Sequence, residues 1–72
     1  MKISFSSHAE KRLKERGIKK EAVIETVEFP EYTIKRSNNE IEAYKKLNGK
    51  MLKVVYFQKE NYIKVITLYY IS

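Results

Sequence analysis

Three cationic side chains near the start of the chain are spaced to share one edge of a helix. His8, Arg12 and Arg16 recur every four residues, and positions four apart lie one above the other on a helix. Arginine offers phosphate oxygens planar, bidentate donors that lysine lacks. The spacing therefore favours a clamp for phosphate. The alternative is a structural role, in which Arg12 packs along aromatic rings of the sheet or hydrogen-bonds carbonyl groups at strand ends, and His8 supports the start of the helix.

The same residue types permit RNA cleavage without a metal. Attack by the 2′-hydroxyl needs a base near that hydroxyl, a cation at the phosphate and a proton donor for the leaving 5′-oxygen. His8 or a lysine can serve as the base, Arg12 and Arg16 can hold the phosphate charge, and a tyrosine can donate the proton. The spacing of these residues does not by itself distinguish cleavage from binding.

A second basic feature runs from residue 43 to residue 59 and contains no acid. Its cations are Lys45, Lys46, Lys50, Lys53 and Lys59, with Tyr44 and Tyr56 between them. Lysines and aromatic rings on one sheet face suit a single-stranded nucleic acid, because phosphates meet the ammonium groups and bases stack on the rings. We predict RNA contacts by Lys45, Lys46, Lys53 and Tyr56. The alternative is that the lysines protect exposed strands from aggregation and the tyrosines belong to the core.

The composition excludes several other kinds of site. The 72 residues include no Cys, no Asp and a single His. A disulfide framework, a thiolate nucleophile, a dinuclear carboxylate or His-rich metal site and a Ser-His-Asp triad therefore lack their parts. We expect neither a metal nor a cofactor. The formal net charge of +6 favours binding to polyanions such as RNA, although Lys- and Glu-rich compositions also belong to thermophilic proteins.

Length and hydropathy predict one domain over residues 1–72 of a cytoplasmic protein. A chain this short accommodates one small core, and no repeat or linker divides it. No apolar run approaches the roughly 20 residues needed to cross a bilayer, and the N-terminus has no secretory apolar segment. We therefore expect no membrane partner.

The candidate clamp lies on a helix with start and stop signals at its two ends. Ser7 and Glu10 have the spacing of a capping box, which predicts a helix over residues 8–16. Gly17 suits the left-handed position that ends many helices. A second helix is expected from Lys19 or Lys20 to the residues before Pro30, where proline disfavours a helical predecessor. Its buried stripe is predicted to be Val23, Ile24 and Val27.

After Pro30 the hydrophobic period changes from 3.6 to 2, which indicates strands. Asn48-Gly49 is a hairpin signal typical of a type I′ turn, in which both residues have positive φ. Residues 2–5 alternate and could form a short edge strand or an extended lead-in. The four strands of the expected sheet cover residues 32–36, 41–47, 51–58 and 62–71. The fold class predicted is α+β, with two N-terminal helices packed on a four-stranded antiparallel sheet.

The chain resembles a family of short prokaryotic proteins known as domain of unknown function forty-two fifty-eight. The family pattern His-Ala-x-x-Arg-x-x-x-Arg-Gly-Ile matches residues 8–18, a Val-bearing helix ending at a proline matches Val23, Val27 and Pro30, and a closing Thr-x-Tyr matches Thr67 and Tyr69. The resemblance covers essentially the whole chain. Such proteins are similar to the RelE/ParE and BrnT-like toxins of toxin–antitoxin systems.

That resemblance implies a RelE-like architecture and a metal-independent endoribonuclease that cuts mRNA, free or on the ribosome. It also implies a small cognate antitoxin as partner. The candidate catalytic residues are then His8, Arg12, Arg16 and Tyr69, with Thr67 added to the RNA contacts. Two alternatives stay open at this point: a non-catalytic nucleic-acid-binding module, and a protein-interaction module whose edge strand pairs with a partner or forms a homodimer.

Overall fold

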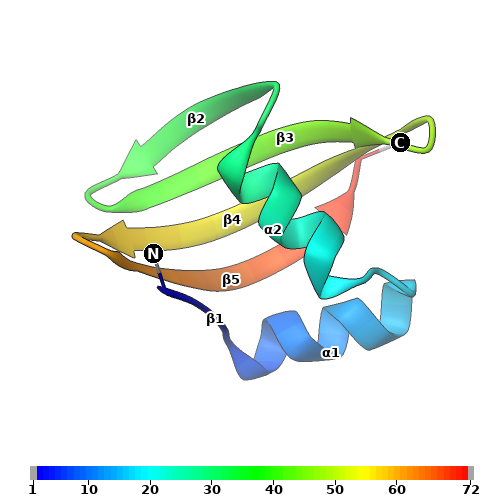
Figure 1. The fold of residues 1–72 in the computed structure, drawn as a ribbon, viewed down its shortest axis with the longest axis horizontal. Helices are drawn as coiled ribbons and strands as arrows, with labels where there is room; N and C mark the ends of the chain where they lie inside the picture. Colours follow the sequence, from blue (N-terminus) through cyan, green and yellow to red (C-terminus); the bar gives the residue numbers. More distant parts are fainter. Residues whose placement is uncertain (1, 72) are drawn as a thin grey trace.

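The computed structural model describes residues 2–71, which form two helices and five strands joined in a single sheet (Figure 1). In chain order the elements are β1 (Lys2–Phe5), α1 (Ser7–Arg16), α2 (Lys20–Glu28), β2 (Tyr32–Ser37), β3 (Glu40–Leu47), β4 (Lys50–Lys59) and β5 (Tyr62–Tyr70). The strands lie in the order β1-β5-β4-β3-β2. The α+β class is confirmed, and the two helices are those predicted.

The prediction of four antiparallel strands is wrong, because β1 adds a fifth strand that runs parallel to β5. Ile3 lies opposite Ile63 and Phe5 opposite Val65. A parallel pair cannot be closed by a tight turn, so the partner of such a strand is distant along the chain. The alternation of residues 2–5 predicted an extended segment, but nothing local in it identifies β5 as its partner.

Short turns join β2 to β5 into a meander. At Asn48 and Gly49 the φ values are 52° and 81°, which confirms positive φ at both central positions of the predicted turn. Asn39 and Glu60 also have positive φ in the other two turns. The two-residue turn sets the register of β3 on β4, so that Leu47 pairs with Lys50 and, three residues further along each strand, Tyr44 pairs with Lys53.

Helix α1 begins one residue earlier than predicted. Ser6, not Ser7, is the N-cap, and its hydroxyl accepts the Ala9 N–H at 3.0 Å. Strand pairing places Ser6 at the N-cap position, because its backbone N–H also donates to the Val65 carbonyl at the end of β1. Gly17 ends α1 with φ of 63°, as predicted, and the N–H of Ile18 bonds the Leu13 carbonyl.

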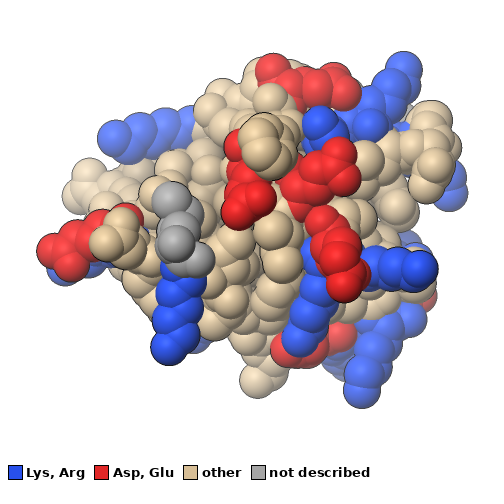
Figure 2. Space-filling model, in the orientation of Figure 1, with Lys and Arg blue, Asp and Glu red and all other residues tan. Residues whose placement is uncertain are grey.

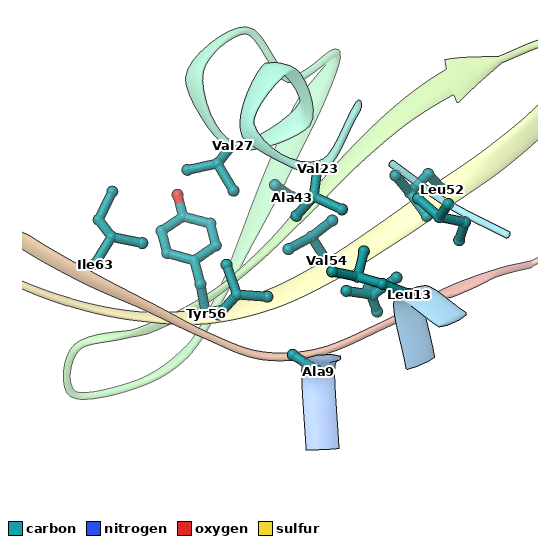
Figure 3. Packing of buried hydrophobic residues seen from close by; sticks show 12 residues of the cluster. Ala9, Leu13, Val23, Val27, Ala43, Leu52, Val54, Tyr56 and Ile63 are labelled. Atoms are coloured by element: carbon teal, nitrogen blue, oxygen red, sulfur yellow. The ribbon is translucent and has the colours of Figure 1, made fainter. Parts of the chain in front are cut away.

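Both helices cover one face of the sheet, and the core lies between them and the strands (Figure 3). Ala9 and Leu13 of α1 and Val23 and Val27 of α2 are buried there. Ile24 is only partly buried, and Thr26 takes its place in the buried stripe, with its hydroxyl donating to the Ala22 carbonyl at 2.9 Å. The sheet contributes Ala43, Leu52, Val54, Tyr56, Ile63, Val65 and Leu68.

We call the other side of the sheet the open face, since neither helix packs over it. Its residues alternate with the core residues along each strand and include Tyr32, Ile34, Glu42, Tyr44, Lys46, Met51, Lys53, Val55, Phe57, Lys64, Thr67 and Tyr69. Strand β1 forms one edge of the sheet, with α1 alongside β5 beyond it, and β2 forms the opposite edge (Figure 1). Within residues 2–71, no helix is long and apolar enough to cross a membrane.

The helix side carries most of the acids of the chain. Three glutamates lie on α2 or at its end, and Figure 2 shows acidic side chains gathered over that helix, with lysines and arginines towards the periphery. Glu10 and Glu15 lie on α1 and pair with Lys20 and Lys11. Because most acidic residues lie on or near the helices, most of the net positive charge lies on the strands.

Candidate nucleic-acid interface

A β-bulge in β5 turns two polar side chains to the open face. Val65 pairs with Tyr56, whereas Thr67 pairs with Val55, so Ile66 is an extra residue opposite that step of β4. Side chains alternate between faces along a strand, and Val65 points into the core. If Ile66 paired regularly with Val55, Thr67 and Tyr69 would also point inwards. The bulge sends them outwards and brings Leu68 into the core.

The start of α1 is bonded to this bulge. The Ser6 hydroxyl, which caps the helix, donates to the Ile66 carbonyl at 2.9 Å. This bond sets the first turn of α1 beside β5 where β1 ends, since β1 pairs only as far as Val65. Residues one turn into the helix therefore lie next to the residues that follow the bulge.

His8 and Thr67 meet at this junction. The Nε2 atom of His8 lies 3.0 Å from the Thr67 hydroxyl, and Nε of Arg12 lies 3.5 Å from the same nitrogen. A guanidinium can only donate, so Nε2 accepts, the Thr67 hydroxyl donates to it and the ring proton is assigned to Nδ1. With this assignment the unprotonated nitrogen of His8 faces the Thr67 hydroxyl and Arg12 beside the open face.

From this junction a row of alternating cations and rings crosses the open face. Arg12 lies over the Tyr69 ring with its Cζ 5.9 Å from the centroid, and Lys53 Nζ lies 5.4 Å from the same centroid. Lys53 is also 5.8 Å from the Tyr44 centroid, and Tyr44 stacks on Tyr32 at 4.5 Å with an interplanar angle of 11°. These cation–π and stacking contacts connect α1, β5, β4, β3 and β2. We call these five residues the interface row.

Glu42 holds the middle of the interface row in place. Its Oε1 accepts the Tyr44 hydroxyl at 2.7 Å, and its Oε2 lies 3.6 Å from Lys53 Nζ and 3.2 Å from Arg36 Nε. The Tyr44 hydrogen bond, opposed by burial and helped by the two cations, lowers the pKa of Glu42 below 4.5. The same hydrogen bond raises the pKa of the Tyr44 phenol. A bond to the Tyr69 hydroxyl raises the pKa of Lys53, which stays a cation.

Residues 5–70 match the family described as Domain of unknown function (DUF4258). No curated protein and no solved structure matches the chain. The chain belongs to the DUF4258 family. All the residues of the interface row, together with His8, Thr67 and the bulge, lie inside the matched segment. The family description assigns no activity, so the function of this DUF4258 protein has to be inferred from the geometry.

The structure brings together five of the residues singled out from the sequence: His8, Arg12, Thr67, Tyr69 and Lys53. Lys46 follows Tyr44 by two residues on the same face of β3 and is exposed. Arg16 is exposed two turns beyond His8 and, among residues 2–71, has no hydrogen-bond, ion-pair or ring partner. It extends the predicted edge of α1 and is free to contact a ligand.

Two of the predicted RNA contacts lie on the helix side of the sheet in this DUF4258 chain. Tyr56 is 5% exposed and packs in the core below Val27 (Figure 3), and burial raises the pKa of its phenol. Lys45 donates to the Phe29 carbonyl at 2.9 Å and lies 3.8 Å from Glu25, so it supports the end of α2. Both sides of β4 are apolar in sequence, and for this reason its pattern does not reveal which face the helices cover.

The hollows of the surface do not coincide with the interface row. Three cavities within residues 2–71 have volumes of about 450, 500 and 300 Å³. They lie at the corner between the helices, along α1 and beneath α2, and none of the three is lined by a residue of the row or by His8. Nor do three or more His, Cys, Asp or Glu side chains of the described chain lie together as metal ligands would. The interface row crosses the open face from α1 to β2 outside these three cavities, a path suited to an extended ligand.

Proposed function

We propose that this protein binds single-stranded RNA across the open face and cleaves it next to His8 without a metal. The observation that carries the proposal is the interface row, in which cations and tyrosine rings alternate across the sheet. Single-stranded nucleic acids present the complementary alternation of phosphates and bases. Rings already held by a neighbouring cation or ring also lose little conformational entropy when a ligand binds.

Binding would use the two ends of the row differently. Tyr32 is 48% exposed and offers its outer ring face to a base, whereas Tyr44 behind it is 6% exposed and stacks only on Tyr32. Arg12 and Lys53 flank Tyr69 and provide positive charge for phosphates on either side of it. Lys46 and Arg16 add charge beside the strand's path.

Cleavage would take place at the His8 junction. The 2′-hydroxyl of the RNA replaces the Thr67 hydroxyl as the donor to His8 Nε2 and passes its proton to that nitrogen. The 2′-oxygen attacks the adjacent phosphorus, the bond from phosphorus to the 5′-oxygen breaks, and the Tyr69 hydroxyl supplies the proton to the leaving oxygen. Arg12 offsets the charge that gathers on the phosphate. The products are a 2′,3′-cyclic phosphate and a 5′-hydroxyl.

The biological role we propose is that of a cytoplasmic toxin that acts on mRNA and is neutralised by a small antitoxin. This role rests on the resemblance of the sequence to RelE/ParE and BrnT-like toxins. An antitoxin with an acidic, extended segment would compete with RNA for the same open face, since both ligands meet the same cations.

One observation favours a second candidate, a non-catalytic RNA-binding module. The His8 junction is exposed, and none of the three cavities described above includes it. General acid–base catalysis gains from exclusion of water, which an exposed site achieves only when the RNA itself covers it. The two candidates share the interface row and differ in whether His8 removes a proton.

The deciding experiment compares cleavage and binding in the same variants. Wild-type protein is incubated with end-labelled single-stranded RNA and with the same RNA carrying 2′-O-methyl groups. We expect cleavage of the first RNA only. His8→Ala should lower the cleavage rate about 100-fold or more, the usual contribution of a general base, while changing RNA affinity less than about threefold. Lys59→Gln, at the exposed end of β4, is the matched control and should leave the cleavage rate intact.

The results separate the two candidates. Binding to RNA with no products from either wild type or His8→Ala would contradict the endoribonuclease and support the binding module. Absence of measurable RNA binding even at low salt would contradict both. A cyclic phosphate at the new 3′ end, detected by mass spectrometry, would support the 2′-hydroxyl mechanism.

A further inference from the structure

Strand β2 is a sheet edge left open along its whole length. It pairs with β3 on one side only, and all six of its residues are exposed. Three large apolar side chains are exposed on or near it: Phe29 at 67%, Tyr32 at 48% and Ile34 at 47%. An unpaired edge with apolar side chains is a template for pairing with another strand. The opposite edge is shorter: it consists of the four-residue strand β1, beyond which α1 lies alongside β5.

The sequence of β2 is complementary to itself in one antiparallel register. When two copies are aligned about Thr33, Tyr32 of one lies opposite Ile34 of the other, and Thr33 lies opposite its own copy. An aromatic beside a β-branched residue is a favourable cross-strand pair. A two-fold axis at Thr33 repeats this pair, as an isologous dimer requires. Both apolar pairs fall on the open face.

We propose that two copies of this chain pair through β2, antiparallel and centred on Thr33, so that their five-stranded sheets join into one. The two open faces then form one surface, and the two interface rows meet at their Tyr32 ends. A single RNA strand can cross both rows, with a His8 junction at each outer end. The dimer is argued from β2 alone, while the shared RNA track rests on the proposed function.

The first test measures mass and proximity without RNA. Wild-type protein is expected to have twice its monomer mass of 8.6 kDa at tens of micromolar by sedimentation equilibrium. Ile34→Lys places an ammonium group opposite Tyr32 of the other copy and should raise the dimer dissociation constant about tenfold. Ile34 is exposed in the single chain, so circular dichroism should remain unchanged.

Cross-linking tests the register. The chain has no cysteine, and directly opposed residues of antiparallel strands lie about 4.5–5.5 Å apart, within reach of a disulfide. Thr33→Cys should therefore form a covalent dimer under mild oxidation, whereas Lys64→Cys, on β5, should not. A wild-type protein that stays monomeric up to about 1 mM would overturn the proposal. So would a covalent dimer that forms in the Lys64→Cys variant and not in the Thr33→Cys variant, or a monomer whose β2 is covered by an antitoxin strand.

The shared track is measured separately by RNA stoichiometry. Wild type should bind one long single strand per two chains, and Ile34→Lys one strand per chain. A dimer that binds one strand per chain would overturn the shared track and leave both the dimer and the RNA function standing. A dimer without RNA binding would overturn the proposed function alone.

Discussion

The two faces of the sheet use the same strands for different purposes. Leu68 and Tyr69 are neighbours in β5, yet Leu68 is fully buried beneath the helices and Tyr69 lies between Arg12 and Lys53 on the open face. Burial of apolar area holds the first face together, while cation–π contacts and hydrogen bonds organise the second. Core packing and the polar contacts of the open face are therefore assigned to alternate residues of the same chain segment.

Tyr44 and Tyr56 show the same difference between the two faces within one residue type. Both phenols have raised pKa values and both are nearly inaccessible. In Tyr56 the cause is burial beside α2, whereas in Tyr44 the first cause is the hydrogen bond that its hydroxyl donates to Glu42. A buried tyrosine is thus a core residue on one face and part of a polar network on the other.

The largest effect on stability is expected from a large-to-small substitution in the core, on the helix-covered face of the sheet. Leu68→Ala removes a side chain with no exposed surface and should lower the free energy of unfolding by about 2–5 kcal/mol, a large share of the total for so small a domain. Urea denaturation followed by circular dichroism measures the change. Tyr69→Ala, one residue away on the open face, is the matched control. A loss at Tyr69 as large as that at Leu68 would contradict the separation of the two faces.

An intermediate effect is expected at the centre of the interface row. Lys53→Gln removes the cation between Tyr44 and Tyr69 and should weaken RNA binding about tenfold at low salt. It should also reduce the slope of log affinity against log salt by about one, since one phosphate contact is lost. Fluorescence anisotropy at several salt concentrations gives both values. Lys45→Gln, the same change on the helix side, should leave the slope unchanged, and an equal effect at both lysines would contradict the role of the open face.

The smallest effect is expected in the pH dependence of stability, through Glu42 on the open face. Because the pKa of Glu42 is lower in the folded protein than its ordinary 4.5, the ionised form stabilises the fold above that value, and this contribution is lost as the pH falls through the folded pKa. Glu42→Gln should therefore be less stable than wild type near pH 6, and the gap should narrow below about pH 4.5. Urea midpoints at each pH measure it, with Glu15→Gln on α1 as the reference. A gap that stays constant down to pH 3 would contradict the prediction.

The sequence predicted the features that depend on neighbouring residues. Gly17 ends α1, Asn48-Gly49 forms the hairpin turn, and His8 and Arg12 share one edge of α1. These signals are local, because a turn or a helix end is fixed by the conformational preferences of a few residues. The parallel pairing of β1 with β5 depends on residues about 60 positions apart and had no such signal.

The interface row was partly within reach of sequence reasoning. A two-residue turn fixes the register of the strands beside it, so Asn48-Gly49 already places Tyr44 opposite Lys53. Tyr56 was predicted to contact RNA, but it lies in the core. Because β4 carries apolar residues on both sides, its sequence does not show which side is buried. Thr67 and Tyr69 entered only through the family resemblance, and the bulge that turns them outwards has no mark in the sequence.

The extra residue at Ile66 makes the interface depend on the length of β5 as much as on its chemistry. If Ile66 paired regularly with Val55, each residue after it would turn to the other face, which would hide the hydroxyl groups of Thr67 and Tyr69 and expose Leu68. One further residue inserted after Ile66 and paired in the ladder would have the same effect, although His8, Thr67 and Tyr69 would all remain in the chain. A change of one residue in length can therefore remove this surface without removing any of its side chains.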